Sequence, residues 1–433
     1  MRNFGIRKFL TFAVLVSVLC TGCGAATTGS ESSETIISNE VSEQEISSSG
    51  ELDSEAFLED YDYFWTMLRE NCPLLEPAKR SGIDVDQMEA DYRTKVETCP
   101  NLEKFMWIMG KINNDFDGFG HICVLDWSQY QTLRELYLSG GESRAIQNEI
   151  LNRDDVKEVY KEFGIPSNHA KVEPPTLLLS ASTGVPASSS QVTAEEISPE
   201  TLLVTIPTFS SDAVEFDGEL LRQIYTKAAA SGKENLILDL TENGGGSDLY
   251  WEQNIVGPNI TDPQLIDTYA LLPMTEFNTA YYEAYGIMKY AHPISELPDF
   301  PNLNPDDIAM CDQFVYFQTL VEPTEDAPLF EGKIWVLTSP KVFSASESFV
   351  QFCKQSGFAT LVGEQTGGDG VGIGDPFLME LPNTHLVVRY TGAYGLNEDG
   401  SCNAEMGTQP DIVPQEGESS LDACLRAIAE TSE

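Results

Sequence analysis

The sequence predicts an α/β protein whose core follows an N-terminal helical subdomain. From Thr201 onward, short apolar runs alternate with segments of helical periodicity, which is the pattern of a mostly parallel sheet covered by helices. Before this region, residues 54–121 place apolar side chains three and four positions apart, as amphipathic helices do. The 433-residue chain is long enough for one large domain or two ordinary ones with a sizeable core.

The N-terminal residues predict the cellular compartment. Basic residues precede an apolar run, Phe9–Leu19, that is too short for an ordinary membrane-spanning helix and fits a signal peptide over residues 1–22. Residues 19–23 (Leu-Cys-Thr-Gly-Cys) resemble a bacterial lipobox, in which Cys23 is lipidated and becomes the mature N-terminus. We therefore expect a protein held by lipid on the extracytoplasmic face of the cell membrane. Ordinary signal peptidase cleavage, with Cys23 unmodified, is the alternative.

A disordered acidic tether is expected over residues 23–53. This segment is rich in Ser, Thr, Glu and Gly, and no Lys or Arg occurs between Lys8 and Arg69. Such a composition buries too little apolar surface to offset the entropy of ordering.

The net charge and the cysteine pattern exclude several function classes. A formal charge of −44 opposes binding to nucleic acid and broad contact with anionic lipid, which leaves the N-terminal lipid as the expected link to the membrane. Of the nine cysteines, Cys20 is expected to leave with the signal peptide and Cys23 to carry the lipid, and the other seven show no CxxC or zinc-ligand spacing. A disulfide between Cys72 and Cys99 stays open, and no metal or cofactor motif is present.

Three helices are predicted in the helical subdomain. Ser54 is placed to cap the first, the second is expected over Val85–Glu97, and Asn101 is placed to cap the third. Residues 122–199 form a connecting region without an assigned fold, apart from a helix near 144–163 and a Ser-rich loop at 180–190.

The core is predicted over residues 200–433, with an insertion at 250–330. The insertion is rich in Tyr and Pro and irregular in pattern, and a segment of this length often forms a wall or lid. The expected strands are Thr201–Pro207, Asn235–Leu240, Lys333–Leu337, Ala359–Gly363 and His385–Arg389, and the expected helices are Phe216–Ala230 and Ser344–Gln355.

Three short segments of the core could carry chemistry. Residues 238–246 lead a strand into the glycine cluster 244–246, whose backbone N–H groups can approach a ligand closely. Residues 344–347 (Ser-Ala-Ser-Glu) begin a helix; Ser344 could be an N-cap with Glu347 as its capping-box partner, or a nucleophile beside free N–H groups. Residues 405–412 alone would be a turn.

In their order and spacing these segments resemble the tail-specific (C-terminal-processing) protease family. The family has an Asn-Gly-Gly loop, a Ser-Ala-Ser-Glu helix, a Gly-Glu-x-Thr-x-Gly segment, matched at 363–368, and a late Gly-x-x-Pro-Asp-Ile segment, matched at 407–412. The resemblance implies a core related in architecture to the crotonase-like spiral. It also implies a serine peptidase that acts on peptides or protein tails without a cofactor or metal.

One departure from the family pattern changes the implied mechanism. Many members carry a Lys 25 residues after the nucleophile, where this chain has Asp369, and an Asp cannot serve as the amine base of a Ser–Lys dyad. The tricorn protease and its relatives instead use Ser, His and Glu, with the His after the helical part. Of the four His residues, His121 in Asp117-Gly118-Phe119-Gly120-His121 fits this place, although the branch has a Ser where Gly120 stands. A purely structural His121 is the alternative.

The resemblance therefore implies acyl transfer with Ser344 as nucleophile and His121 as general base. Glu405 is implied as the carboxylate that orients the imidazole, and the N–H groups of Gly244 or Gly245 and of Ala345 as the oxyanion hole. One residue of slippage would make Ser346 the nucleophile. Two other readings stay open: a catalytically silent lipoprotein that binds peptide or another ligand in the same cleft, and another acyl hydrolase.

Overall fold

The computed structural model describes residues 52–138, 141–163 and 190–431. The predicted signal peptide, the lipidation site Cys23, nearly all of the tether and most of the Ser-rich stretch lie outside these residues. Within the described ranges, no helix is both long enough and apolar enough to cross a membrane.

The core is a five-stranded sheet in the order β2-β3-β4-β8-β9. The last four strands run parallel, and β2 pairs antiparallel with β3 at one edge. Four of the five predicted core strands are confirmed in this sheet to within two residues at their ends, and β2 is an additional strand. The strands are β2 Thr193–Ser198, β3 Thr201–Thr205, β4 Asn235–Asp239, β8 Lys333–Thr338 and β9 Thr360–Gly363.

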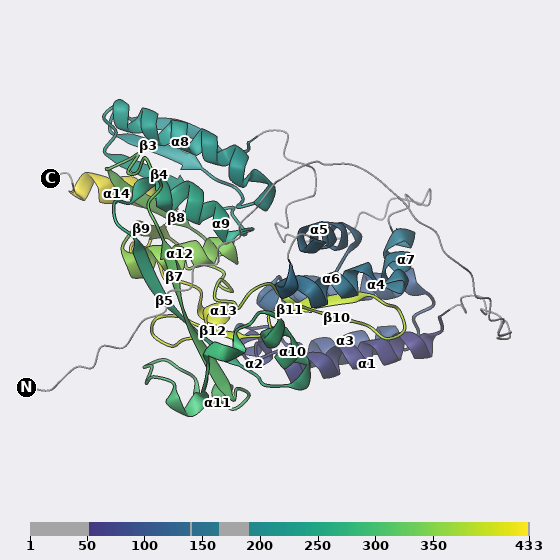
Figure 1. The fold of residues 1–433 in the computed structure, drawn as a ribbon. Helices are drawn as coiled ribbons and strands as arrows, with labels where there is room; N and C mark the ends of the chain where they lie inside the picture. The colour runs from purple at the N-terminus through teal and green to yellow at the C-terminus, as the bar shows by residue number, and fades with distance from the viewer. Residues whose placement is uncertain (1–51, 139–140, 164–189, 432–433) are drawn as a thin grey trace, which may run out of the picture.

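Helices cover both faces of this sheet because successive side chains of each strand point to opposite sides. Leu236 and Leu238 of β4 pack with α8 (Val214–Ala230) and α12 (Ala345–Ser356). Ile237, between them, packs with Trp335 of β8 against α14 (Ser420–Thr431). The buried runs of the sequence thus form the middle layer of an α/β/α sandwich, with α8 and α14 at one end of the molecule (Figure 1).

The helical part lies at the other end and is larger than predicted (Figure 1). The first helix begins one residue after its cap: the side chain of Asp53, and not that of Ser54, accepts from the backbone N–H groups of Glu55 and Ala56. Asn101 caps its helix as predicted. The helices are α1 Ser54–Asn71, α2 Leu75–Arg80, α3 Val85–Val96, α4 Leu102–Phe116, α5 Trp127–Leu138, α6 Ala145–Asn152 and α7 Asp154–Phe163.

A three-stranded sheet ties the helical part to the C-terminal third of the chain. In it β11 (Val387–Tyr390) pairs antiparallel with β1 (Cys123–Val124) and with β10 (Phe377–Glu380). The strand predicted at 385–389 therefore exists, but its assignment to the parallel core was wrong. The chain returns to the helical part, where the buried carboxylate of Asp60 accepts from the backbone N–H groups of Asn383 and Thr384 at 2.8 and 2.7 Å.

The insertion is ordered, contrary to its irregular sequence. Strands β5 (Gln264–Leu272) and β7 (Gln313–Val321) pair antiparallel along their whole length. Figure 1 shows this pair running from the parallel sheet down to α11 (Pro305–Ile308). The shorter elements of the region and of the C-terminal segment are α9 Asp248–Trp251, α10 Glu276–Ala284, β6 Ala291–Pro293, β12 Tyr394–Leu396 and α13 Asn403–Met406.

The seven cysteines after the leader are all buried and unpaired, so the disulfide considered between Cys72 and Cys99 is absent. Burial raises the pKa of the Cys72 thiol to about 12, and this thiol packs in the core as an apolar group would.

Glu347 anchors the first turn of α12 in a way that differs from a capping box. Ser344 makes no side-chain cap bond, and its backbone N–H donates to Gly368. The fully buried Glu347 instead accepts from Asn403 Nδ2 at 2.7 Å and Thr408 Oγ1 at 2.6 Å. Burial raises the pKa of this carboxyl from 4.5 to about 7, and no hydrogen-bond partner among the described residues reaches its Oε2 atom.

The raised pKa of Glu347 predicts a pH-dependent stability. The folded protein holds this proton more tightly than the unfolded chain, so the free energy of unfolding should fall as pH rises from about 4.5 to about 7. Glu347→Gln, which stays neutral, should flatten urea-unfolding free energies in that window. Glu242→Gln, at an exposed ion pair with Lys341, is the control and should keep the wild-type slope. An unchanged slope in Glu347→Gln would refute this account.

Candidate active site

The candidate site lies where three core loops leave the carboxyl ends of parallel strands. The glycine loop follows β4, the segment that leads to Ser344 follows β8, and the loop that carries Asp369 follows β9. In a parallel sheet such loops meet at one edge, which is where open α/β sheets bind ligands. Isolated parallel bridges hold these loops: Phe343 pairs with Gly368, and Phe209, in the segment after β3, pairs with Gly246.

Ser344 has a strained backbone at the start of α12. Its φ of 56° and ψ of −126° are rare for a residue with a side chain. Gly245 packs directly against it: a Cβ on Gly245 would lie 2.6 Å from the Phe343 carbonyl oxygen and 2.9 Å from the Ala345 nitrogen. Only glycine therefore lets the loop after β4 approach the serine so closely.

His121 reaches the same edge from the helical part. A left-handed Asp117 ends α4, and Gly118, Gly120 and His121 also have positive φ, which turns the chain sharply. The turn is held by β1, whose Cys123 pairs with Arg389, and by the Gly120 carbonyl, which accepts from the Thr391 N–H at 2.7 Å.

A continuous hydrogen-bonded chain joins Ser344, His121 and Asp369. His121 Nε2 lies 3.2 Å from Ser344 Oγ, and His121 Nδ1 lies 2.6 Å from Asp369 Oδ2. Because a carboxylate can only accept, Nδ1 carries the ring proton and Nε2 presents a lone pair to the serine hydroxyl. The imidazole is thus oriented to take a proton from Ser344.

Backbone strain is concentrated in these three residues. In the described part of the chain, five non-glycine residues have positive φ, and Ser344, His121 and Asp369 are three of them. Each such residue costs on the order of 1–3 kcal/mol, so the surrounding contacts must hold it in place.

The third position of the set is held by Asp369 and not by the predicted Glu405. Glu405 faces away, with both carboxylate oxygens bound by the Arg80 guanidinium at 2.6–3.0 Å. Arg80 also binds the buried Asp307, so Glu405 joins α13 to α2 and α11. Asp369 stands 25 residues after Ser344, where the family pattern predicts a Lys, and this pattern indicated only the loss of an amine base and not a carboxylate partner for His121.

Thr391 is a further member of the site that the sequence did not indicate. Its hydroxyl donates to Asp369 Oδ2 at 3.0 Å and lies 3.0 Å from His121 Nδ1. Gly120, which stands where the resemblance places a Ser, has no side chain that could make such a contact. The Phe343 ring packs on the imidazole, with 4.9 Å between the ring centroids.

Of the three predicted oxyanion donors, only the Ala345 N–H is free and lines the cavity among the described residues. The Gly245 N–H already donates to Asn243 Oδ1 at 2.9 Å, and Gly244 is not part of the cavity wall. Ala345 and Gly246 do line the cavity, and no hydrogen-bond acceptor for their N–H groups is found among the described residues. These two amides are the donors available to an oxyanion.

The alternative residues considered from the sequence lie elsewhere. Ser346 is fully buried, and its hydroxyl donates to Asn243 Oδ1 at 2.6 Å, away from His121. His292 is exposed on the insertion, 3.9 Å from Glu296, and His169 lies outside the described residues.

A cavity of about 520 Å³ opens in front of Ser344 and His121. This volume is within the range of small-molecule and peptide sites. The helical part contributes α5 to its wall, through Leu133 and Leu136, and the C-terminal segment contributes Arg389. Both halves of the chain are therefore needed to form it.

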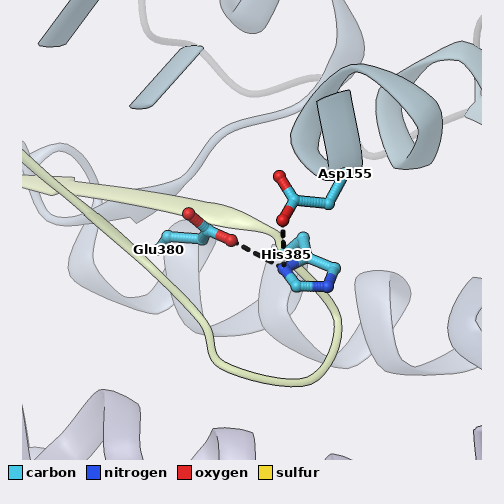
Figure 2. Close-up of side chains that lie close together, drawn as sticks. All are labelled: Asp155, Glu380 and His385. Carbon is cyan, nitrogen blue, oxygen red and sulfur yellow. Dashed lines mark hydrogen bonds and ion pairs between the residues drawn. The ribbon is translucent and has the colours of Figure 1, made fainter. Parts of the chain in front are cut away.

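A second ionisable cluster lies away from this cavity. Asp155, Glu380 and His385 hold ligand-type atoms within 4.8 Å of one another where α7 meets the turn between β10 and β11 (Figure 2). However, Arg153 already pairs with Asp155 at 2.6 Å and with Glu380 at 2.8 Å. His385 Nδ1 lies 2.6 Å from Glu380 and donates to it. We interpret the cluster as an ion-paired tie between two elements.

The chain is similar to several solved structures of low sequence identity. A candidate peptidase from Parabacteroides merdae ATCC 43184 is 17% identical, over 86% of this chain and 96% of that one, with a TM-score of 0.49. Mature CPAF complexed with lactacystin is 14% identical, over 87% and 97%, with a TM-score of 0.48. A lipoprotein from Streptococcus agalactiae is 12% identical, over 87% and 96%, with a TM-score of 0.43. No curated protein matches the chain in sequence.

The family comparison covers the region that holds most of the site. Residues 200–413, which include the glycine loop, Ser344 and Asp369, match the model of peptidase family S41. His121 lies outside the matched residues and joins the site through the fold. The chain belongs to peptidase family S41, the tail-specific serine peptidases, and has the mixed α/β fold with a helical N-terminal region that its sequence predicts.

Proposed function

We propose that this peptidase hydrolyses peptides or exposed protein tails through a Ser344–His121–Asp369 triad. One observation carries the proposal: the hydrogen-bonded chain from Ser344 Oγ through the imidazole to Asp369, with distances of 3.2 and 2.6 Å. The serine and the histidine are 223 residues apart in sequence, so their contact in a family S41 cavity argues for a shared chemical role.

In this mechanism the Ser344 hydroxyl attacks the scissile carbonyl while His121 Nε2 accepts its proton. The tetrahedral oxyanion accepts hydrogen bonds from the N–H groups of Ala345 and Gly246. His121 then donates its proton to the leaving amine, and a water molecule hydrolyses the acyl-enzyme by the same route in reverse. Asp369 holds the tautomer and stabilises the imidazolium, and Thr391 holds Asp369.

The identity of the nucleophile is tested by two serine variants. Ser344→Ala removes the attacking oxygen and should reduce kcat for a peptide identified from a library by about 10⁶-fold. Ser346→Ala loses only the bond to Asn243, and its kcat/KM should stay within about tenfold of wild type, with a stability loss on the order of 1 kcal/mol. Activity that is kept in Ser344→Ala and lost in a folded Ser346→Ala would reverse the assignment. A folded wild type that cleaves no peptide would favour a silent binding protein.

The third residue is tested by comparing two carboxylates. Asp369→Asn removes the charge that faces His121 Nδ1 and should reduce kcat by about 10³- to 10⁴-fold. Glu405→Gln should leave kcat near the wild-type value and instead lower the melting temperature, because Arg80 loses a carboxylate. Steady-state kinetics and thermal melts on both variants separate the roles. A large loss of kcat in a stable Glu405→Gln protein would show that Asp369 is not the triad acid.

We further propose that the enzyme is lipid-anchored through Cys23 on the extracytoplasmic face of the membrane. The support is in the sequence: a basic start, the apolar run Phe9–Leu19, and a lipobox-like segment followed by a polar, acidic stretch. A single anchor of this kind would hold a strongly acidic enzyme at the surface without broad contact between the protein and anionic lipid.

The anchor predicts a specific fractionation result. In a bacterial host that processes lipoproteins, the full chain should incorporate radiolabelled palmitate and sediment with the membrane. Cys23→Ala should lose both properties because the acylated thiol is absent, whereas Cys20→Ala should keep both. Incorporation that survives in Cys23→Ala would rule out this site.

A further inference from the structure

The charged residues that line the catalytic cavity, with one exception, each hold a side-chain hydrogen bond or an ion pair. Asp369 is engaged by His121 and Thr391, and the Asp248 carboxylate accepts from the indole of Trp251 at 3.0 Å. Arg144 donates two hydrogen bonds to Asp375, from Nε to Oδ2 at 2.6 Å and from Nη2 to Oδ1 at 3.2 Å. This bidentate pair compensates the charge of the guanidinium and that of the carboxylate.

Arg389 is the exception. No carboxylate of the described residues lies within ion-pairing distance of its guanidinium, and its Nε atom is shielded from solvent without a hydrogen-bond partner there. Its neighbour is the buried thiol of Cys123, a weak partner whose pKa is raised by burial. A buried donor without a partner is costly, and the guanidinium as a whole has no carboxylate that compensates its charge, which leaves that charge available to an anion in the cavity.

The overall composition makes this unpaired cation more informative. The chain has 69 acidic side chains and only 25 Lys and Arg, so carboxylates are available to pair with almost any arginine. Arg389 nevertheless lines the cavity without an ion-pair partner among the described residues. The same cavity wall includes apolar residues such as Leu133 and Ile373, and a less polar surrounding strengthens the attraction between a guanidinium and an incoming anion.

The position of Arg389 relates it to the reacting atoms. It lies in β11, two residues before Thr391, so the two side chains leave the same side of an extended segment about 7 Å apart along the chain. Thr391 contacts His121, and both Thr391 and Arg389 line the cavity. About 7 Å is the length of two residues of an extended peptide.

We propose that Arg389 binds a carboxylate of the substrate within about three residues of the scissile bond. The carboxylate can be an Asp or Glu side chain or a free C-terminus, since a guanidinium recognises both in the same bidentate way. This inference rests on the proposed function, because it names the substrate class for the same cavity. It makes Arg389 a specificity-determining residue and gives it no part in proton transfer.

The test measures binding without turnover. Ser344→Ala protein is titrated with labelled peptides that differ only by Glu or Gln at each of three positions on either side of the cleavage site, all with amidated C-termini. A second set has neutral side chains and either a free or an amidated C-terminus. One acidic form should bind about 10- to 100-fold more tightly than its neutral twin, as expected for a charge-assisted pair.

Variants then assign the preference. Ser344→Ala/Arg389→Gln should bind the acidic and neutral peptides equally, and Arg389→Lys should keep part of the preference. The control is Arg222→Gln on α8, which removes the same charge from an ion pair with Asp326. This variant should keep the full preference for the acidic peptide. In the active protein, Arg389→Gln should lower kcat/KM for the acidic peptide relative to that for the neutral peptide by the same factor.

Three results would overturn the proposal. They are equal affinity for acidic and neutral peptides in the parent protein, a preference that survives in a stable Arg389→Gln protein, and no binding of any peptide to the folded chain. Failure of the triad proposal differs from these, because it appears as absent turnover in wild type while peptide binding is still measured. A preference confined to the free C-terminus would identify the terminal carboxylate, and one confined to a Glu position would identify a side chain.

Discussion

The site depends on one contact between distant parts of the chain, the antiparallel pairing of β1 with β11. Cys123 and Val124 pair with Arg389 and Val388, and this short ladder fixes the turn that ends in His121. The same strand leads into Thr391, whose N–H binds the Gly120 carbonyl and whose hydroxyl binds Asp369. Without this pairing the core would present Ser344 and Asp369 without an imidazole between them.

Two buried carboxyl groups near α12 illustrate how environment divides their roles. Asp369 is hydrogen-bonded by the His121 imidazole at 2.6 Å and by the Thr391 hydroxyl at 3.0 Å. Glu347 has no cationic neighbour; burial raises its pKa to about 7, and the charge of Asp369 adds to the rise. One carboxylate therefore faces the imidazole, while the other holds α12 to Asn403 and Thr408.

Local patterns predicted those parts of the fold that depend on local physics. The strands of the parallel sheet are buried apolar runs, and α12 begins at its Ser-Ala-Ser-Glu segment, so both were identified from the sequence. The β5–β7 pair was missed because burial does not alternate strictly along either strand, so neither shows the period of two that marks a half-buried strand. The strand at 385–389 was placed in the wrong sheet because its partner, β1, is only two residues long.

The site could be predicted only as far as local motifs reached. Ser344 and His121 were identified as candidates by motif and by order along the chain. The role of Asp369 depends on a contact with a residue 248 positions earlier, and the diversion of Glu405 depends on Arg80, 325 positions earlier. No spacing rule within the core contains either contact, so only the folded structure distinguishes the two acids.

The most direct measurement of the central claim is the location of a covalent adduct. Purified wild-type protein is treated with a fluorophosphonate, digested, and analysed by tandem mass spectrometry to identify the modified serine. The account predicts one adduct, on Ser344. In a folded His121→Ala protein this adduct should form much more slowly than in wild type. An adduct on Ser346, or on Ser344 at an unchanged rate in His121→Ala, would contradict it.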